Sequence, residues 1–453
     1  MSSLHDTQSA SVLPSASADT ARGRAARSRR SALHIYREVV REAMHGLARN
    51  RLRAGLSMLG ISWGIVSVVM LLAYGDGFHN ALMSGFKGAF SDGTCVIWPG
   101  QTSLQAGGER AGRRVRLTVA DADAVAALPA IRSASPEIIE RLVVGFGERS
   151  SIQLVRGVNV EYGEMRNERA APGQGRFLEG VDLDERRRVA FLGREVARKL
   201  FDNRPALGQT IRIAGKPFEV IGVMNDKVQM SSYFSPDRYS IFIPYTVAGE
   251  ITDGRYLDTL VFQTRNPLQQ ERAIRQVREE LGRRLGFNPD DERALSINDS
   301  VENTRQMTGI TDGLKVVLGF IGVLTLAIGG VGIMNIMFVS VKERTREIGI
   351  RKALGARRRE ILWQFLCEGL VTTFLGGVIG VLTSWVLVWL FSPRPFLSEL
   401  FDDVTRVTDI HLVLSVELLT VCTGILVVVG LISGFVPAYR ASRLDAIESL
   451  RYE

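Results

Sequence analysis

Four long stretches of the sequence are apolar and contain no Asp, Glu, Lys or Arg. They cover residues 54–75, 316–341, 369–393 and 418–439. A helix of roughly 20 apolar residues crosses the ~30 Å hydrocarbon core of a bilayer, and each stretch reaches that length. The pattern therefore predicts four transmembrane helices, with one long polar segment between the first and the second.

The predicted boundaries of the spans and of their connections follow from these stretches. We expect the four transmembrane helices at residues 54–75, 314–341, 361–392 and 412–437. The remaining segments are, in chain order, 1–33, 34–53, 76–313, 342–360, 393–411 and 438–453. The predicted fold class is a membrane protein with four transmembrane α-helices and a large α+β domain inserted between the first and second spans.

The two N-terminal segments have different patterns. Residues 1–33 are rich in Ser, Ala and Arg without a hydrophobic period, which predicts a disordered cytoplasmic tail. In residues 34–53, Ile35, Val39 and Leu47 recur at near-helical spacing among arginines. This spacing predicts an amphipathic helix on the inner membrane surface, which serves either as a topology anchor or as a partner-docking element.

The inserted segment 76–313 has the mixed periods of an α+β domain, which we expect to form two packed subdomains. Helices are predicted at residues 118–128, where Thr118 and Asp121 form a capping pair, at 194–201 and at 267–286. Gly215 and Lys216, between two strands, predict a type II′ hairpin turn. Alternating apolar residues predict strands at 142–146, 151–156, 210–214, 217–223, 240–245 and 257–264.

The positive charge of the chain is unevenly distributed. The formal net charge is +8, yet residues 1–53, 342–368 and 440–453 together carry ten more basic than acidic residues. By the positive-inside rule, these segments are cytoplasmic, and the inserted domain and the loop 393–411 are periplasmic. The charge thus indicates the topology of a multi-pass protein of a bacterial inner membrane, and no nucleic-acid partner is expected.

Motifs of catalysis and of metal binding are absent from the sequence. Gly107 and Gly112 have the spacing of a phosphate-binding loop, but Arg113 and Arg114 follow where a lysine and a hydroxyl are required. The five histidines are scattered, and the inserted domain contains a single cysteine, Cys95. We therefore expect no catalytic, cofactor-binding or metal-binding residue in this chain, which disfavours a free-standing membrane enzyme.

Three of the four predicted spans contain glycines four residues apart. Such pairs let helix backbones approach closely, which matters in lipid because hydrophobicity does not drive helix pairing there. The predicted helix-packing residues are Gly60, Gly64, Gly376, Gly380, Gly430 and Gly434.

The connection between the second and third spans mixes charged and apolar residues. Ile348, Ile350, Ala353 and Leu354 recur among its charges, which predicts a short helix with an apolar contact face. Such a helix acts either as a docking element for a cytoplasmic partner or as an interfacial topology anchor. The residues concerned are Glu343, Arg344, Thr345, Arg346, Glu347, Ile348, Gly349, Ile350, Arg351, Lys352, Ala353, Leu354, Gly355 and Ala356.

Several long motifs resemble one known family. The run Gly329-Gly330-Val331-Gly332-Ile333-Met334-Asn335-Ile336-Met337, together with residues 343–356, resembles the FtsX-type permease module of MacB-like ABC transporters. Residues 437–453 are similar to the closing motif of that module, and residues 189–201, 207–211 and 218–223 resemble the MacB-type periplasmic core domain. The resemblance covers roughly residues 34–453.

The resemblance implies a permease subunit that transmits mechanical motion to its periplasmic domain. Residues 343–356 would be the coupling helix that engages an ATPase. MacB itself carries its ATPase on the same chain, and this sequence shows none, so a separate ATPase subunit holding ATP and Mg²⁺ is implied, with no cofactor bound by this chain. The other implied partners are a second permease, as a homodimer or heterodimer, a periplasmic adaptor, an outer-membrane channel and membrane lipids.

Two roles remain open for such a permease. The first is export of a substrate, or its extraction from the periplasmic side of the inner membrane. The alternative is signalling in the manner of FtsX, whose periplasmic domain activates a cell-wall hydrolase.

Overall fold

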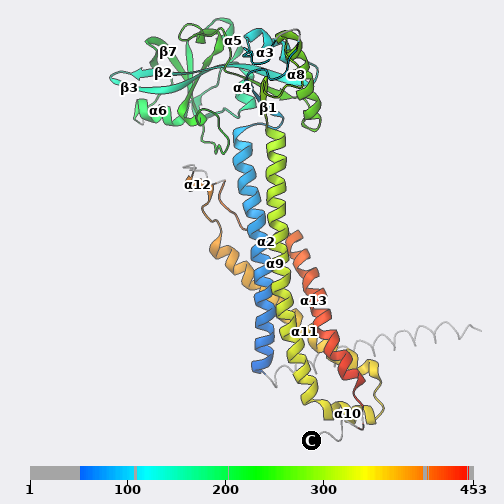
Figure 1. Ribbon diagram of the computed structural model, residues 1–453. Coiled ribbons are helices and arrows are strands. Elements are labelled where there is room, and N and C mark those ends of the chain that lie inside the picture. Colours follow the sequence, from blue (N-terminus) through cyan, green and yellow to red (C-terminus); the bar gives the residue numbers. More distant parts are fainter. Residues whose placement is uncertain are drawn as a thin grey trace, which may run out of the picture. The chain divides into compact units, whose positions relative to one another are not determined.

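The computed structural model describes residues 51–106, 110–202, 204–400, 406, 408–445 and 447, which form two compact units (Figure 1). The helical unit contains the described residues up to Ala73, Val317–Leu390 and those from Leu414 onward. The sheet unit contains Tyr74–Val316 and Phe391–Val413. The predicted tail 1–33, residues 34–50 of the predicted helix 34–53, and residues 446 and 448–453 of the predicted tail 438–453 lie outside the described residues.

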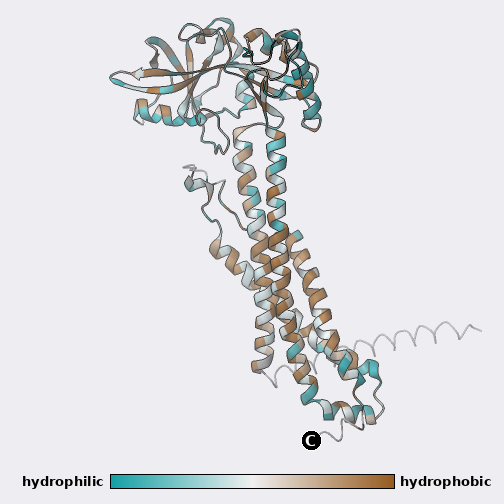
Figure 2. Cartoon of the chain, viewed as in Figure 1, coloured by the Kyte–Doolittle hydropathy of each residue, from teal (hydrophilic) through white to brown (hydrophobic). Residues whose placement is uncertain are grey.

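Four long helices confirm the predicted four-span fold. They are α2 (Arg51–Ala89), α9 (Ser300–Glu343), α11 (Arg358–Phe391) and α13 (Val416–Arg443). Each is long and apolar enough to cross a membrane. Figure 2 shows that hydrophobic residues dominate these helices within the helical unit.

Helices α2 and α9 both continue well beyond their charge-free stretches. Within the sheet unit, polar contacts join the two extensions. Asp76 Oδ1 lies 2.8 Å from Lys315 Nζ, and His79 Nδ1 lies 2.7 Å from Thr311 Oγ1. These side chains satisfy one another, so polar residues that resemble the start of a loop in the sequence belong to a helix pair instead.

The glycine pair of α11 packs on α2. A Cβ added to Gly376 would lie 3.1 Å from the carbonyl oxygen of Met58, and one added to Gly380 would lie 3.0 Å from that of Ser62. Both spacings are tighter than ordinary van der Waals contact. Side chains at these two positions would therefore push the α2 and α11 backbones apart.

The glycine pair of α13 packs on α11. A Cβ on Gly430 would lie 2.6 Å from Thr373 Cγ2, whereas a Cβ on Gly434 would lie 3.4 Å from the nearest atom, in Leu366. Gly430 is thus the tighter of the two positions.

The glycine pair of α2 faces α9 unevenly. A Cβ on Gly64 would lie 3.1 Å from Leu326 Cα, whereas one on Gly60 would have no atom within 4 Å. Gly60 takes part through its carbonyl oxygen, which would lie 2.9 Å from a Cβ added to Gly329. In this pairing the close approach therefore depends on the glycine of α9 rather than on Gly60.

The sheet unit is built on ten strands. Nine follow the order β10-β1-β9-β2-β3-β8-β5-β7-β4, and β6 pairs with both β2 and β7. Most neighbours are antiparallel, but β3 with β8 and β5 with β7 are parallel. The strands are β1 (Thr94–Pro99), β2 (Ile131–Phe146), β3 (Arg149–Val158), β4 (Ala170–Gly175), β5 (Val189–Leu192), β6 (Thr210–Ile213), β7 (Lys216–Met224), β8 (Ser240–Pro244), β9 (Thr259–Thr264) and β10 (Leu295–Asp299).

Apolar side chains lie on both faces of this sheet. In β1, Cys95 and Ile97 belong to one core cluster and Val96 to the other, because successive strand residues point to opposite faces. Helices α3 (Val119–Ala126), α6 (Arg194–Phe201) and α8 (Gln270–Leu285) contribute to the first cluster. Helix α4 (Glu161–Met165) and the residues at the end of α2 contribute to the second. The smaller helices are α5 (Gly180–Asp184), α7 (Tyr245–Ala248) and α12 (Leu397–Leu400).

Most local predictions for the sheet unit are confirmed. Helix α6 has the predicted limits, α8 ends at Gly286 in the left-handed conformation with φ +70°, and Thr118 and Asp121 form a capping box at α3. The strand predictions fall on β2, β3, β6, β7, β8 and β9. The division into two subdomains stays a prediction. Strand β2 pairs with β9 on one side and with β3 on the other, so the sheet is continuous.

The predicted hairpin turn is wrong in position and type. Ile213 pairs with Lys216, so the central residues are Ala214 and Gly215 rather than Gly215 and Lys216. Their φ values are +46° and +82°. Two positive φ values match a type I′ turn, whose twist fits that of the strands. Alanine rarely adopts a positive φ, so its presence at position 214 gives no indication of a type I′ turn in the sequence.

Candidate functional site: the helix between α9 and α11

A short helix, α10 (Thr345–Ala353), follows α9 directly and occupies most of the segment 343–356. Glu343 is the last residue of α9, and Arg344 forms the break between the two helices. The end of α10 is a Schellman motif, in which Gly355 N donates to Lys352 O and Ala356 N donates to Arg351 O. Gly355 has φ +99°, a value that glycine adopts without strain.

Helix α10 has one buried and one exposed face. Ile348 and Gly349 are buried in the helical unit. The exposed positions repeat at intervals of three and four residues and so share one side of the helix. They are Arg346, Glu347, Ile350, Arg351, Ala353 and Leu354.

The apolar residues predicted to form one contact face are divided between these two sides. Ile348 is 3% exposed and lies in the interior, whereas Ile350 is 46% and Leu354 84% exposed. The predicted contact face is therefore wrong for Ile348. The outward surface consists of three apolar residues, Ile350, Ala353 and Leu354, flanked by Arg346, Glu347 and Arg351.

Two hydrogen bonds attach α10 and its preceding break to α11. Arg344 Nη1 donates to Glu368 Oε2 over 3.1 Å, and Arg351 Nη1 donates to Gln364 Oε1 over 2.7 Å. Glu368 is itself almost fully buried. A charge-assisted bond in such a partly desolvated position is stronger than one in water. In the sequence Glu368 directly precedes the charge-free stretch 369–393, and no local pattern identifies its partner, which lies 24 residues away.

A third attachment connects α10 to α13. Lys352 Nζ donates to the carbonyl oxygens of Ser442 and Leu444, the first at 2.7 Å. Carbonyls at a helix C-terminus lack partners within the helix and attract cations. Desolvation and the nearby charge of Arg358 lower the pKa of Lys352. With its covalent link to α9, α10 is thus attached to three of the four long helices.

The chemistry available on this surface is binding rather than catalysis. Its exposed residues are arginines, a glutamate and aliphatic side chains, and no nucleophile is paired with a base. In the part of the chain that the structure describes, no group of three or more His, Cys, Asp or Glu side chains is placed to hold a metal ion. The structure therefore shows a firmly held helix with a mixed apolar and charged outer surface.

A buried ionic network in the sheet unit does not follow from the sequence pattern. Arg156 Nη1 donates to Glu137 Oε1 over 2.8 Å, and both side chains are fully buried. Glu137 also accepts hydrogen bonds from Tyr162, Tyr233 and Thr259. Charged residues in alternating strands normally indicate a solvated face, so no local signal could have identified this pair.

The network continues through a second set of buried charges. Arg166 Nη2 donates to both oxygens of Asp237, at 3.1 and 2.9 Å. Lys227 Nζ lies 2.8 Å from Asp237 and 2.7 Å from Glu168. Burial alone would raise the pKa of Asp237, but Arg166, Lys227 and Arg156 hold it well below its ordinary value. Burial raises the pKa of Glu168 to about 8 despite the opposing charge of Lys227.

Comparison with known proteins shows which family this architecture belongs to. Residues 54–280 match the MacB-like periplasmic core domain, and residues 319–446 match the FtsX-like permease C-terminal domain. The macrolide export ATP-binding/permease protein MacB of Burkholderia cenocepacia (strain HI2424) is 35% identical over 447 residues, which are 96% of this chain and 61% of that protein. MacB of Burkholderia pseudomallei (strain 1710b) is 34% identical over 92% of this chain and 60% of its own length.

A solved structure matches part of the chain. The crystal structure of the periplasmic region of MacB from Actinobacillus actinomycetemcomitans has a TM-score of 0.40 at 22% identity, covering 49% of this chain and 95% of that one. The chain spans roughly three fifths of the length of the two Burkholderia relatives. The core-domain match alone covers half of the sequence, and the permease match covers α9 from residue 319, together with α11 and α13. The chain therefore belongs to the MacB-like family of ABC transporter permeases.

Proposed function

We propose that this chain is a permease subunit whose α10 binds a separate ATPase subunit and whose sheet unit is moved by ATP hydrolysis. In this proposal the termini and α10 are cytoplasmic, as the positive charge of residues 1–53 and 342–368 indicates. The sheet unit is periplasmic. ATP and Mg²⁺ are held by the partner, and a second permease chain completes the transporter.

The observation that carries this proposal is the attachment of α10. A helix that only anchors topology needs charge at the membrane surface, but it needs no bonds to neighbouring helices. Here Arg344, Arg351 and Lys352 bind α11 and α13, and the outward face is left available to a partner. Force applied to that face would move the ends of three helices together.

Helix α9 is suited to carry such a movement. It runs without interruption from Ser300 to Glu343, so α10 follows one of its ends and β10 precedes the other. At 1.5 Å per residue its 44 residues extend about 66 Å, more than the thickness of a bilayer. Displacement at Glu343 would therefore be passed along a helix that continues into the sheet unit.

The work expected of this movement is export of a substrate, or its extraction from the periplasmic side of the inner membrane. Two relatives are described as macrolide export proteins, which supports a transport role. The match of residues 54–280 to the MacB-like core domain likewise supports transport over activation of a cell-wall hydrolase. A periplasmic adaptor and an outer-membrane channel would complete an export pathway.

Photocrosslinking tests the docking role of α10. A benzophenone amino acid at Ile350 or Leu354 would be placed on the exposed face, and one at Phe374, 67% exposed on α11, would serve as the control. In native membranes the first two positions are expected to crosslink to a protein with nucleotide-binding motifs, and the control is not. Absence of an ATPase from the α10 crosslinks would overturn the docking role.

A double substitution tests the functional consequence. Glu347→Ala with Ile350→Ala removes a charge and an apolar side chain from the outward face. The described bonds of Arg344, Arg351 and Lys352 stay in place. The variant is expected to lose the co-purifying ATPase. Retention of ATPase activity that is fully coupled to substrate would count against the proposal.

A further inference from the structure

The end of α2 is enclosed by the sheet unit on one side. Ala89 is fully buried and Phe90 is 8% exposed. A Cβ added to Gly88 would overlap the carbonyl oxygen of Val228, and Met230 N donates to Gly85 O over 3.3 Å. The last turns of α2 therefore touch the backbone of the loop between β7 and β8.

The residues after α4 hold the same end of α2. Asn167 Nδ2 donates to the carbonyl oxygen of Lys87 over 2.9 Å, which satisfies one of the free carbonyls of the last turn. Ser91 N donates to Met165 O over 2.9 Å. Between these two bonds lies Arg166.

Arg166 is stacked between two aromatic rings. Its Cζ atom lies 4.2 Å from the ring centroid of Phe90 and 4.9 Å from that of Tyr233. The guanidinium group is fully buried, and its Nε and Nη1 atoms have no hydrogen-bond partner among the described residues. Stacking on Phe90 and the two bonds from Nη2 to Asp237 therefore fix the plane of the group.

Contacts run without a gap from Phe90 to the middle of the sheet. Phe90 touches Arg166, Arg166 binds Asp237, and Asp237 lies 3.8 Å from Arg156 of β3. Arg156 in turn binds Glu137 of β2. Buried ion pairs of this kind resist separation, because displacing one charge leaves its partner without compensation.

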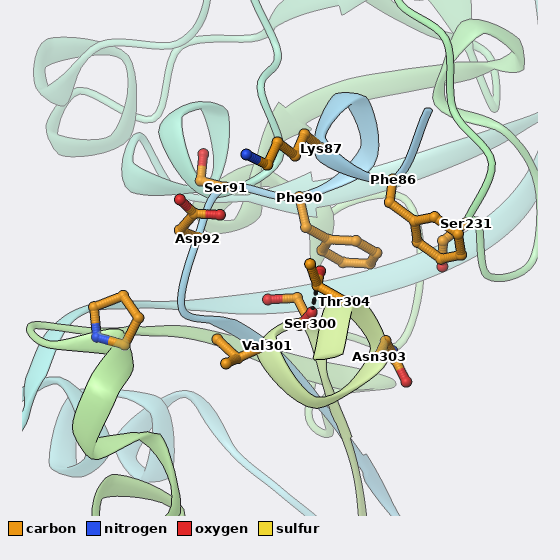
Figure 3. Close-up of a pocket in the computed structure, with 11 residues that line it drawn as sticks. Phe86, Lys87, Phe90, Ser91, Asp92, Ser231, Ser300, Val301, Asn303 and Thr304 are labelled. Atoms are coloured by element: carbon orange, nitrogen blue, oxygen red, sulfur yellow. Dashed lines mark hydrogen bonds between the residues drawn. The ribbon is translucent and has the colours of Figure 1, made fainter. Parts of the chain in front are cut away.

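Phe90 also lines a cavity. This cavity has a volume of about 170 Å³ and is lined by Phe86, Phe90, Asn303 and Thr304 among others. Figure 3 shows these lining residues at the end of α2 and the start of α9. Helix α9 is fixed independently, since Asp299 Oδ1 accepts bonds from Val301 N and Gln270 Nε2. Beyond the contact of His79 with Thr311, the end of α2 and the start of α9 thus join the strands through separate contacts, with the cavity between them.

We propose that Arg166 is a positioning residue that passes movement of α2 to strands β2 and β3, and that Phe90, the residue that follows α2, presses on it. The cavity gives Phe90 room to move relative to α9, whereas the ionic network makes the sheet follow it. This inference rests on the proposed function, because it assigns a path to the movement that ATP hydrolysis is proposed to produce.

Distance measurements in the complex test this path. Spin labels would be placed at Ile152→Cys on β3 and Phe320→Cys on α9, both well exposed, in a background carrying Cys367→Ser. The purified complex with its ATPase would be compared without nucleotide and after trapping with ATP and vanadate. The labelled complex without substitutions at Phe90 or Arg166 is expected to show a different label distance in the two states.

Three variants test whether the contact between Phe90 and Arg166 transmits the movement, independently of whether the transporter works. Phe90→Leu and Arg166→Lys each remove one member of the stacked pair. Each is expected to reduce the response, meaning the shift of the label-distance distribution on trapping with ATP and vanadate, by about tenfold, within the usual range of allosteric coupling. Vanadate trapping of nucleotide should be unchanged. Phe90→Tyr keeps the ring on which Arg166 stacks, so it should retain the response.

The outcomes are distinguishable. A full response in both Phe90→Leu and Arg166→Lys would overturn the role of Arg166 and leave the proposed function standing. Absence of any response in the unsubstituted complex would overturn both. Thermal unfolding checks that the variants are folded, and if Arg166→Lys is not, the comparison of Phe90→Leu with Phe90→Tyr decides.

Discussion

Lys352 Nζ donates a hydrogen bond of 2.7 Å to the carbonyl oxygen of Ser442, and this contact joins α10 to the end of α13. The two residues are 90 positions apart in the sequence. Because the carbonyl groups at the end of α13 have no partner within the helix, the ammonium group both completes α13 and fixes α10.

Lys352→Met is therefore expected to destabilise the helical unit by about 1–2 kcal/mol, the cost of losing a hydrogen bond from a charged group. Thermal unfolding of the purified chain in detergent measures this effect. Lys342→Met is the matched control, since Lys342 is exposed at the end of α9 and should change stability by less than about 0.5 kcal/mol. Equal effects of the two substitutions would contradict the anchoring role of Lys352.

Gly430→Ala is expected to weaken the packing of α13 on α11 by about 1–3 kcal/mol, because the new methyl group would overlap Thr373. Gly60→Ala is the control within the same set of glycine pairs, since its methyl group meets open space. It should be neutral or slightly stabilising because alanine favours helix. Melting temperatures of the two variants should differ in this order, and the reverse order would refute the packing of α13 described above.

Glu137→Leu is expected to destabilise the sheet unit by about 3–5 kcal/mol, because it leaves the buried charge of Arg156 without its partner. Glu164→Gln breaks an exposed pair with Arg132 and should cost less than about 1 kcal/mol. Trp98 is the only tryptophan in residues 74–316, and the other four are Trp63, Trp363, Trp385 and Trp389. In a background in which those four are replaced by Phe, the fluorescence of Trp98 during urea unfolding reports on the sheet unit. A cost for Glu137→Leu as small as for the control would contradict the buried network.

The stability of the sheet unit should depend on the protonation of Glu168. Its pKa is raised in the fold to about 8 from an ordinary value of 4.5, so the folded state binds the proton more tightly than the unfolded state. The stabilisation is complete below about pH 4.5 and is lost as the pH rises toward 8. Glu168→Gln cannot titrate at this position.

The difference in melting temperature between the unsubstituted chain and Glu168→Gln should therefore fall as the pH is raised from 5 to about 8. Lys227, Asp237 and Arg166 are the charged groups around Glu168. A difference that stays constant with pH would show that Glu168 is ionised in the fold throughout.

Local signals in the sequence were sufficient for several elements. Pro267 and Gly286 lie at the two ends of α8, and each residue affects only the backbone of its near neighbours in the sequence. The four spans were equally clear, because each charge-free stretch is long enough to cross a bilayer as a helix. The residue pattern of 343–356 likewise indicated a helix, although it did not show that Ile348 faces inward.

The remaining features depend on contacts between distant residues. Helix α2 continues past Gly75 because Asp76 and His79 find partners on α9, more than 200 residues later. The pair of Glu137 and Arg156 could not be predicted for a related reason, because each residue alone resembles part of a solvent-exposed strand face. The members of these pairs lie 19 or more residues apart, beyond the few residues over which a helix or strand pattern repeats.

The pairing of β1 with β10 also sets the order in which the protein can be completed during synthesis. Cys95 lies opposite Asp299, so the strand that follows α2 bonds to the strand that precedes α9. A ribosome must therefore produce about two hundred intervening residues before the edge of the sheet can close. Asp299 is followed immediately by α9, so closure of the sheet and insertion of the second span become possible at nearly the same moment.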